Sequence, residues 1–176
     1  MVQSVELVLD DAADAAIRGQ WATLAQAGLP SQADHISPSN APHVTVGVAD
    51  EIDEAAETRL AEVVGVVPIP IRLGPIVLLG GRRVVLARMV VVTEPLLSLH
   101  SAVSQALVDC PGQSDYLRPG HWVPHVTLAG RLKPQMLPEA IDLLQEPTQV
   151  AQDQQISAVA MRRWDSVARR TWIIGG

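Results

Sequence analysis

The chain has 176 residues, of which 48% are hydrophobic and 18% charged, and its formal net charge is −6. This composition is ample for one folded domain or two small lobes that share a core, and it gives no sign of disorder. The acidic balance excludes a protein that follows a long nucleic-acid backbone, because such proteins carry a basic surface. Phenylalanine is absent and aromatic residues make up 3%, so the core must be built from Val, Leu, Ile and Ala.

The first part of the chain alternates strands and helices. The pattern predicts a strand at 4–9, a helix at 12–27 that ends before Gly28 and Pro30, a polar loop at 31–41 and a strand that begins with HVTV at 43–46. Asp50 is predicted to cap a helix that runs to about Val64.

The rest of the chain continues this alternation. Two β-rich runs, 68–73 and 76–92, are expected first, with a hairpin turn at Gly80-Gly81. The later elements are a helix from Thr93 to about Asp109, a loop at 111–115, a strand within 121–129, a helix from Pro134 or Pro138 to about Gln145, and strands at about 155–164 and 169–174.

One five-residue pattern occurs twice, as Pro42-His43-Val44-Thr45-Val46 and as Pro124-His125-Val126-Thr127-Leu128. In a strand, residues two apart share a face, so each histidine points the same way as its threonine while the apolar residues point to the core. Two histidines and two hydroxyls can give an acid, a base and two hydrogen-bond donors to a single anion. The repeated pattern therefore predicts a phosphate site, with His43 and His125 as catalytic candidates and Thr45 and Thr127 as binding candidates.

The two halves of the chain match in their order of elements. Each runs helix, HVT strand, helix and then a strand pair. We therefore interpret residues 1–176 as a single domain of two pseudo-symmetric lobes, each carrying one motif, with both motifs facing a central cleft.

A metal site is the first alternative reading of the histidines. Zinc usually takes three or four His, Cys or carboxylate ligands, whereas the one cysteine, Cys110, is isolated and neither HVT strand contains a carboxylate. His121 and His125 are spaced for a helix, but Pro124 and the β-formers around it favour a strand. The sequence therefore predicts no required metal.

The remaining histidines and the arginine pairs have structural readings. His35 is expected in a polar loop, His100 on a helix at the edge of the core and His121 at the surface. The pairs at 82–83, 162–163 and 169–170 are expected to be solvated strand positions, although one of them could flank the cleft. Trp122 or Tyr116 could stack on a base, but ordinary packing is the simpler expectation.

The cysteine count and the N-terminus bear on the compartment. A single cysteine forms no internal disulfide, which fits a reducing environment, and Cys110 reads as a buried, inert thiol. The first residues lack the basic segment of a signal peptide, and no apolar run is long enough for a membrane span. We expect a cytoplasmic protein without membrane partners.

The two His-x-Thr motifs resemble those of the 2H phosphoesterase superfamily, and most closely its bacterial branch of 2′-5′ RNA ligase or RNA 2′,3′-cyclic phosphodiesterase-like proteins. The resemblance covers the whole chain by element order, and its specific content is His43, Thr45, His125 and Thr127, with a proline before the second histidine. It implies an α+β, bilobal fold in which two antiparallel sheets line a cleft with helices outside. Many bacterial members have an arginine soon after the second motif; here Gly130 precedes Arg131, which shifts the register by one residue.

The resemblance also implies a function. The enzyme would hydrolyse 2′,3′-cyclic phosphate ends of RNA or nucleotides to a 2′-phosphate by two-histidine acid/base catalysis, without metal or cofactor, and the reverse reaction would form a 2′-5′ linkage. The partner would be a nucleotide or short RNA end, with no extended nucleic-acid binding. The alternatives are another cyclic phosphate or 2′-5′-linked nucleotide as substrate, chosen by loops 31–41 and 111–122, or a nucleotide-binding module without turnover. The sequence carries no signal for the oligomeric state.

Overall fold

The computed structural model describes residues 2–145 and 155–175. The strands of this part are β1 (Gln3–Leu9), β2 (His43–Ala49), β3 (Ile69–Gly80), β4 (Val84–Val90), β5 (His125–Leu132), β6 (Gln155–Asp165) and β7 (Arg170–Ile173). Its α-helices are α1 (Asp11–Gln26), α2 (Glu54–Val63), α3 (Glu94–Ala106) and α4 (Leu137–Leu144). The expected α+β class with antiparallel strands is confirmed.

The strands are hydrogen-bonded in the order β2-β1-β6-β3-β4-β5, and β7 also pairs with β6. Every pairing is antiparallel. Strand β3 links two halves of the sheet, because its residues 69–72 pair with β6 and its later residues pair with β4. The two HVT strands, β2 and β5, therefore belong to different halves, yet their Cα atoms approach within 8 Å.

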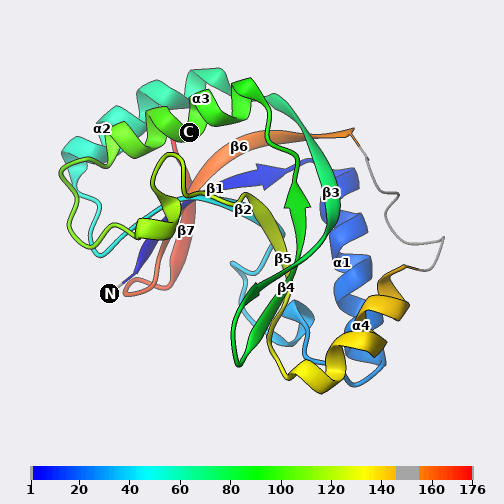
Figure 1. Cartoon of the computed structure of the whole chain (residues 1–176). Coiled ribbons are helices and arrows are strands. Elements are labelled where there is room, and N and C mark those ends of the chain that lie inside the picture. The colour runs from blue at the N-terminus through cyan, green and yellow to red at the C-terminus, as the bar shows by residue number, and fades with distance from the viewer. Residues whose placement is uncertain (1, 146–154, 176) are drawn as a thin grey trace.

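The helices lie in two groups (Figure 1). Helices α2 and α3 pack side by side next to β2, and α1 contacts α4 together with β5. Helices α1 and α3 begin at polar caps: the side chain of Asp10 accepts a hydrogen bond from the Ala13 amide, and Thr93 accepts one from Leu96, with Pro95 in the first turn of α3 as predicted.

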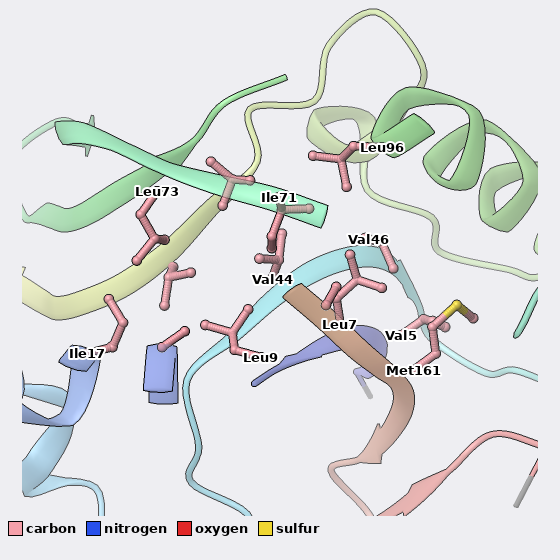
Figure 2. Packing of buried hydrophobic residues seen from close by; sticks show 14 of the residues in the cluster. Val5, Leu7, Leu9, Ile17, Val44, Val46, Ile71, Leu73, Leu96 and Met161 are labelled. Atoms are coloured by element: carbon pink, nitrogen blue, oxygen red, sulfur yellow. The ribbon is translucent and has the colours of Figure 1, made fainter. Parts of the chain in front are cut away.

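The core is aliphatic, as the composition requires, and it runs through both halves of the sheet. Val44 and Val46 of β2 are buried and point into the same group of side chains as Leu7, Ile71 and Leu96 (Figure 2). In β5, Val126 and Leu128 are buried in the same alternating way. The apolar half of each HVT strand is thus fixed by the core, which directs the histidines and threonines to the opposite face.

Two boundary predictions are wrong. Asp53 caps α2, with its carboxylate accepting from the Ala56 amide, so the cap lies three residues after the predicted cap Asp50. The predicted break between 73 and 76 is absent, because Gly74 and Pro75 lie where β3 exchanges β6 for β4 and form an irregularity within one strand.

The described helices include none with both the length and the apolar character that crossing a membrane requires.

Candidate functional site

His43 and Thr45 lie on the polar face of β2. Both side chains are half-buried, between the fully buried Val44 and Val46. Across the β1 pairing, Thr45 lies opposite Glu6, so the carboxylate of Glu6 is on the same face as the motif.

His125 and Thr127 occupy the same positions in β5, half-buried between Val126 and Leu128. Their opposite residues in β4 are Met89 and Ala87. In the second half of the sheet, Ala87 therefore lies opposite the motif threonine. In the first half, the carboxylate residue Glu6 has this position.

The two histidine rings are anchored in the same way. The Nδ1 atom of His43 lies 2.7 Å from the carbonyl oxygen of Ala41, and that of His125 lies 2.7 Å from the carbonyl oxygen of Val123. Because a carbonyl can only accept, each Nδ1 carries the ring hydrogen and donates it, which leaves Nε2 as the proton-exchanging atom. The guanidinium of Arg162 also approaches Nδ1 of His43 at 3.4 Å, but two donors cannot bond to each other, so this is a close contact only.

Two tryptophan side chains hold the backbone of the motif threonines. The indole of Trp122 donates to the carbonyl of Thr45 at 3.0 Å, and that of Trp21 donates to the carbonyl of Thr127 at 3.0 Å. Since Trp122 comes three residues before His125, its bond ties the entrance of β5 directly to β2. Neither threonine hydroxyl has a hydrogen-bond partner within the described part of the chain, so both hydroxyls are free to donate to a ligand.

A pocket of about 450 Å³ opens beside His43. Its lining residues are Glu6, Gln32, His35, Ser39, Asn40, His43, Arg162, Trp164 and Thr171. Thr45, His125 and Thr127 are not among them. The structure thus brings the two motif strands together, but it places only His43 of the four candidate residues in this pocket.

A buried charge network adjoins His43. The Arg162 Nε donates to Glu6 Oε2 at 2.7 Å, the Ser4 hydroxyl donates to Glu6 Oε1 at 2.7 Å, and His43 Nε2 lies 3.6 Å from the same Oε1. Glu6 is 4% and Arg162 8% exposed, so the pair is largely shielded from water and interacts strongly. At 3.6 Å the contact is too long for a hydrogen bond, and it is an ion pair only when His43 is protonated.

The prediction for the 162–163 pair is wrong, because both side chains are buried. Arg163 donates to Glu57 and to the Gln3 side chain, while Arg162 binds Glu6 and lines the pocket. The sequence did contain a signal: charged residues interrupt two otherwise apolar strands, SVELVL and AVAMRRW. If both strands are central in the sheet, these charged side chains need partners of opposite charge. The arginines at 82–83 and 169–170 are exposed, as expected.

His100 lies in the core rather than at its edge, being 1% exposed. Its ring stacks on Trp122 with centroids 4.0 Å apart, and its Nε2 donates to the carbonyl of Leu117 at 2.9 Å. Burial lowers the pKa of His100, so the ring is neutral at physiological pH. Together these contacts fix Trp122, and through it the position of Thr45, which confirms that Trp122 serves in packing.

Arg131 has a left-handed backbone conformation, with φ 62°. It lies at an irregularity in the pairing of β5 with β4, where residues 130–131 have no partner in the register. Its side chain is exposed and lines a shallow pocket together with Gln32 and His35. The same two residues also line the pocket beside His43, so Arg131 lies near its rim across the 31–41 loop.

Within residues 2–145 and 155–175, no three His, Cys, Asp or Glu side chains converge as a ligand set for a metal ion. Cys110 is buried, and burial raises the pKa of its thiol, which favours the unreactive protonated form.

We predict that Glu6→Leu lowers the free energy of unfolding by about 3–5 kcal/mol, because it leaves the Arg162 guanidinium buried without its carboxylate. Chemical denaturation measures the loss. Asp14→Ala is the matched control: it removes the carboxylate of the exposed Arg18 pair and should cost no more than about 1 kcal/mol. The double change Glu6→Leu with Arg162→Met removes both charges and should recover much of the stability; similar losses in Glu6→Leu and the control would contradict the buried network.

We predict that His100 makes the protein less stable in acid. At pH values between the lowered pKa of the folded state and the ordinary value of 6.5, His100 binds fewer protons in the folded protein than in the unfolded chain. Its contribution to stability is therefore complete above pH 6.5 and falls as the pH drops toward the folded-state pKa. The slope cannot exceed about 1.4 kcal/mol per pH unit for one proton. His100→Gln keeps a donor for the Leu117 carbonyl but does not titrate. Unfolding measured across this range should show a shallower acid loss in the variant, and parallel curves would be the contrary result.

The family model of the 2′-5′ RNA ligase superfamily matches residues 11–168. No protein with a curated description matches the chain.

Solved structures share the fold at low sequence identity. A Thermus thermophilus protein, TT0787, aligns with a TM-score of 0.59 and 16% identity over 100% of this chain and 99% of its own. E. coli LigT complexed with 3′-AMP aligns with a TM-score of 0.56 and 19% identity over 97% and 92%. Kluyveromyces marxianus Usb1 with uridine monophosphate aligns with a TM-score of 0.53 and 12% identity over 98% and 97%.

The family match spans both motif strands and most of the chain, and the resemblance seen in the motifs is confirmed. The chain belongs to the 2′-5′ RNA ligase superfamily, and its chemistry is that of a phosphoesterase or ligase.

Proposed function

We propose that the protein hydrolyses 2′,3′-cyclic phosphate ends of RNA or nucleotides to 2′-phosphates, with His43 and His125 as acid and base. The observation that carries the proposal is the identical anchoring of the two rings. Each Nδ1 donates to the carbonyl two residues earlier, so each Nε2 is left to exchange a proton. Two histidines anchored in the same way are unlikely to arise by chance, and they suit a reaction that needs two proton transfers.

The proposed reaction is an in-line displacement at phosphorus. A water molecule attacks the phosphorus and gives its proton to the Nε2 of one histidine, while the bond from phosphorus to O3′ breaks and O3′ takes a proton from the other Nε2. The product keeps the phosphate on O2′, and the two histidines exchange protonation states. The same displacement with the 5′-hydroxyl of a second strand as the nucleophile in place of water would break the bond from phosphorus to O3′ and form a 2′-5′ linkage. No metal takes part in this scheme.

Thr45 and Thr127 are proposed to donate to the non-bridging phosphate oxygens. Their hydroxyls share a face with the histidines, and donors placed where charge builds up stabilise the transition state. The Trp122 and Trp21 indoles hold the backbone of both residues in place. These bonds hold the strand backbone that carries the hydroxyls before substrate arrives.

We further propose that residues 1–176 are one domain of two related lobes, with one motif in each. Three correspondences support this: the alternating burial of β2 and β5, the two Nδ1 anchors, and the two indole bonds to threonine carbonyls. The residues opposite the motif threonines, Glu6 and Ala87, differ between the lobes.

The proposed substrate is a nucleotide or a short RNA end. Two structures of similar fold hold a mononucleotide, 3′-AMP in LigT and uridine monophosphate in Usb1. The net charge of −6 supports local recognition of an end over a long phosphate track. The free, buried Cys110 suits the cytoplasm as the proposed compartment.

Either His43→Ala or His125→Ala should reduce the opening of a 2′,3′-cyclic nucleotide by at least about 10²-fold, the usual contribution of a single acid or base. The assay contains EDTA and separates the 2′- and 3′-phosphate products. His121→Ala is the control, because this exposed histidine belongs to neither motif strand and should retain full activity. Comparable activity in a motif variant would refute the mechanism, and saturable binding without product would favour a non-catalytic nucleotide-binding module. Turnover only of a different cyclic phosphate or a 2′-5′ linkage would reassign the substrate.

Thr45→Val and Thr127→Val should each lower kcat by about 10²-fold, because each removes one donor to the transition state while keeping the shape of the side chain. KM should change much less than kcat, since the donors act most strongly on the charge of the transition state. Steady-state kinetics on the same cyclic nucleotide measure both values. A rise in KM alone would instead assign the threonines to ground-state binding.

A further inference from the structure

The chain contains four tryptophans, one tyrosine and no phenylalanine, so each aromatic ring can be accounted for. Three of the tryptophans donate a hydrogen bond to the protein: Trp21 to the Thr127 carbonyl, Trp122 to the Thr45 carbonyl and Trp172 to the Glu57 carboxylate. The same three rings make further contacts: Trp21 has a cation–π contact with Arg18, Trp122 stacks on His100, and Trp172 has cation–π contacts with Arg163 and Arg170. Three of the four are thus fully engaged in structure.

Trp164 is different. In the part of the chain that the structure describes, its indole N–H has no hydrogen-bond partner and its ring makes no stacking or cation–π contact. It is only half-buried, and it lines the pocket that contains His43. No contact among the described residues accounts for the exposure of this large apolar ring in a pocket next to a proposed catalytic histidine.

The surroundings of Trp164 form the floor of the pocket. In β6, Arg162 is two residues earlier and so on the same face; the strand partners of Trp164 are Thr171 of β7 and Ser4 of β1. The Thr171 hydroxyl has no hydrogen-bond partner among the described residues. This side of the pocket thus offers one aromatic ring, the Arg162 guanidinium paired with the Glu6 carboxylate, and one hydroxyl.

The wall of the pocket comes from the 31–41 loop. Asn40 uses its side-chain N–H groups on the carbonyls of Gln32 and His35, which aligns the amide and leaves its oxygen available as an acceptor. At about 450 Å³, the pocket is of the size that holds a small organic ligand. An aromatic platform with a few polar groups at its edge is the usual chemistry of base recognition on single strands.

We infer that this pocket is a nucleobase subsite, in which the base of the substrate stacks on Trp164 while its phosphate reaches His43. The inference rests on the proposed function and sharpens it: the substrate carries a base, and cyclic phosphates that lack one are poor substrates. Tyr116, the one aromatic residue that is largely exposed, at 84%, lies on the other loop and is not part of the subsite.

Binding tests the subsite without turnover. The purified protein is titrated calorimetrically with adenosine 2′-monophosphate and, separately, with inorganic phosphate. The wild-type protein should prefer the nucleotide, and Trp164→Ala should weaken nucleotide binding by about 5- to 150-fold, as expected for the loss of one base–aromatic stack, while its affinity for phosphate is unchanged. Trp164→Phe keeps an aromatic face and should retain most of the affinity. Tyr116→Ala is the matched control and should bind like the wild type.

Kinetics then separate the subsite from the reaction itself. With adenosine 2′,3′-cyclic phosphate, Trp164→Ala should raise KM with little change in kcat, whereas kcat/KM for glycerol 1,2-cyclic phosphate, which has no base, should be the same in both proteins. Equal losses on both substrates, equal binding of nucleotide by wild type and Trp164→Ala, or loss of base preference in Tyr116→Ala instead would overturn the subsite. Discriminating binding without hydrolysis of either compound would sustain the subsite and reject the proposed reaction.

Discussion

The alternation of side chains along β2 and β5 is the constraint that joins the core to the site. Val44 and Val126 are fully buried, and the residues on either side of each are turned to the opposite face. A shift of either strand by one residue would bury a histidine and a threonine and expose aliphatic side chains, at a cost set by the whole core. The packing that stabilises the protein therefore also fixes the direction of its proposed catalytic groups.

The polar face is less symmetric than the core. Both rings donate Nδ1–H to a carbonyl, but only His43 lies beside a buried ion pair, Glu6 with Arg162. A buried ion pair gives little net stability compared with apolar residues of the same size, so stability alone does not account for it. In the second half, Ala87 takes the place opposite the threonine. A reaction in which one histidine acts as acid and the other as base is favoured when the two identical side chains have different surroundings.

The sequence predicted the features that depend on the short period of a strand, and it missed those that depend on contacts between residues far apart in the chain. The repeated HVT pattern was sufficient for the strands and their faces, because strand alternation is local. It was not sufficient for Arg162, since an arginine on a strand is exposed or buried according to whether a carboxylate such as Glu6 lies on the neighbouring strand, and β1 and β6 are far apart in the chain. The proposed role of Trp164 was missed for the same reason, because Trp164 stands out only once the other three tryptophans are seen to have partners in the folded chain.

The acidity of the chain makes such a short-range site necessary. A protein of charge −6 repels a phosphorylated ligand at a distance, but at physiological ionic strength this repulsion is screened beyond about 8 Å. What decides binding is then the charge and surface within the pocket itself, where Arg162 is already partly neutralised by Glu6. With little cationic charge to spare, affinity must come from contacts that do not depend on charge. The proposed subsite at Trp164 would supply such a contact for a substrate that carries a base, and not for phosphate alone.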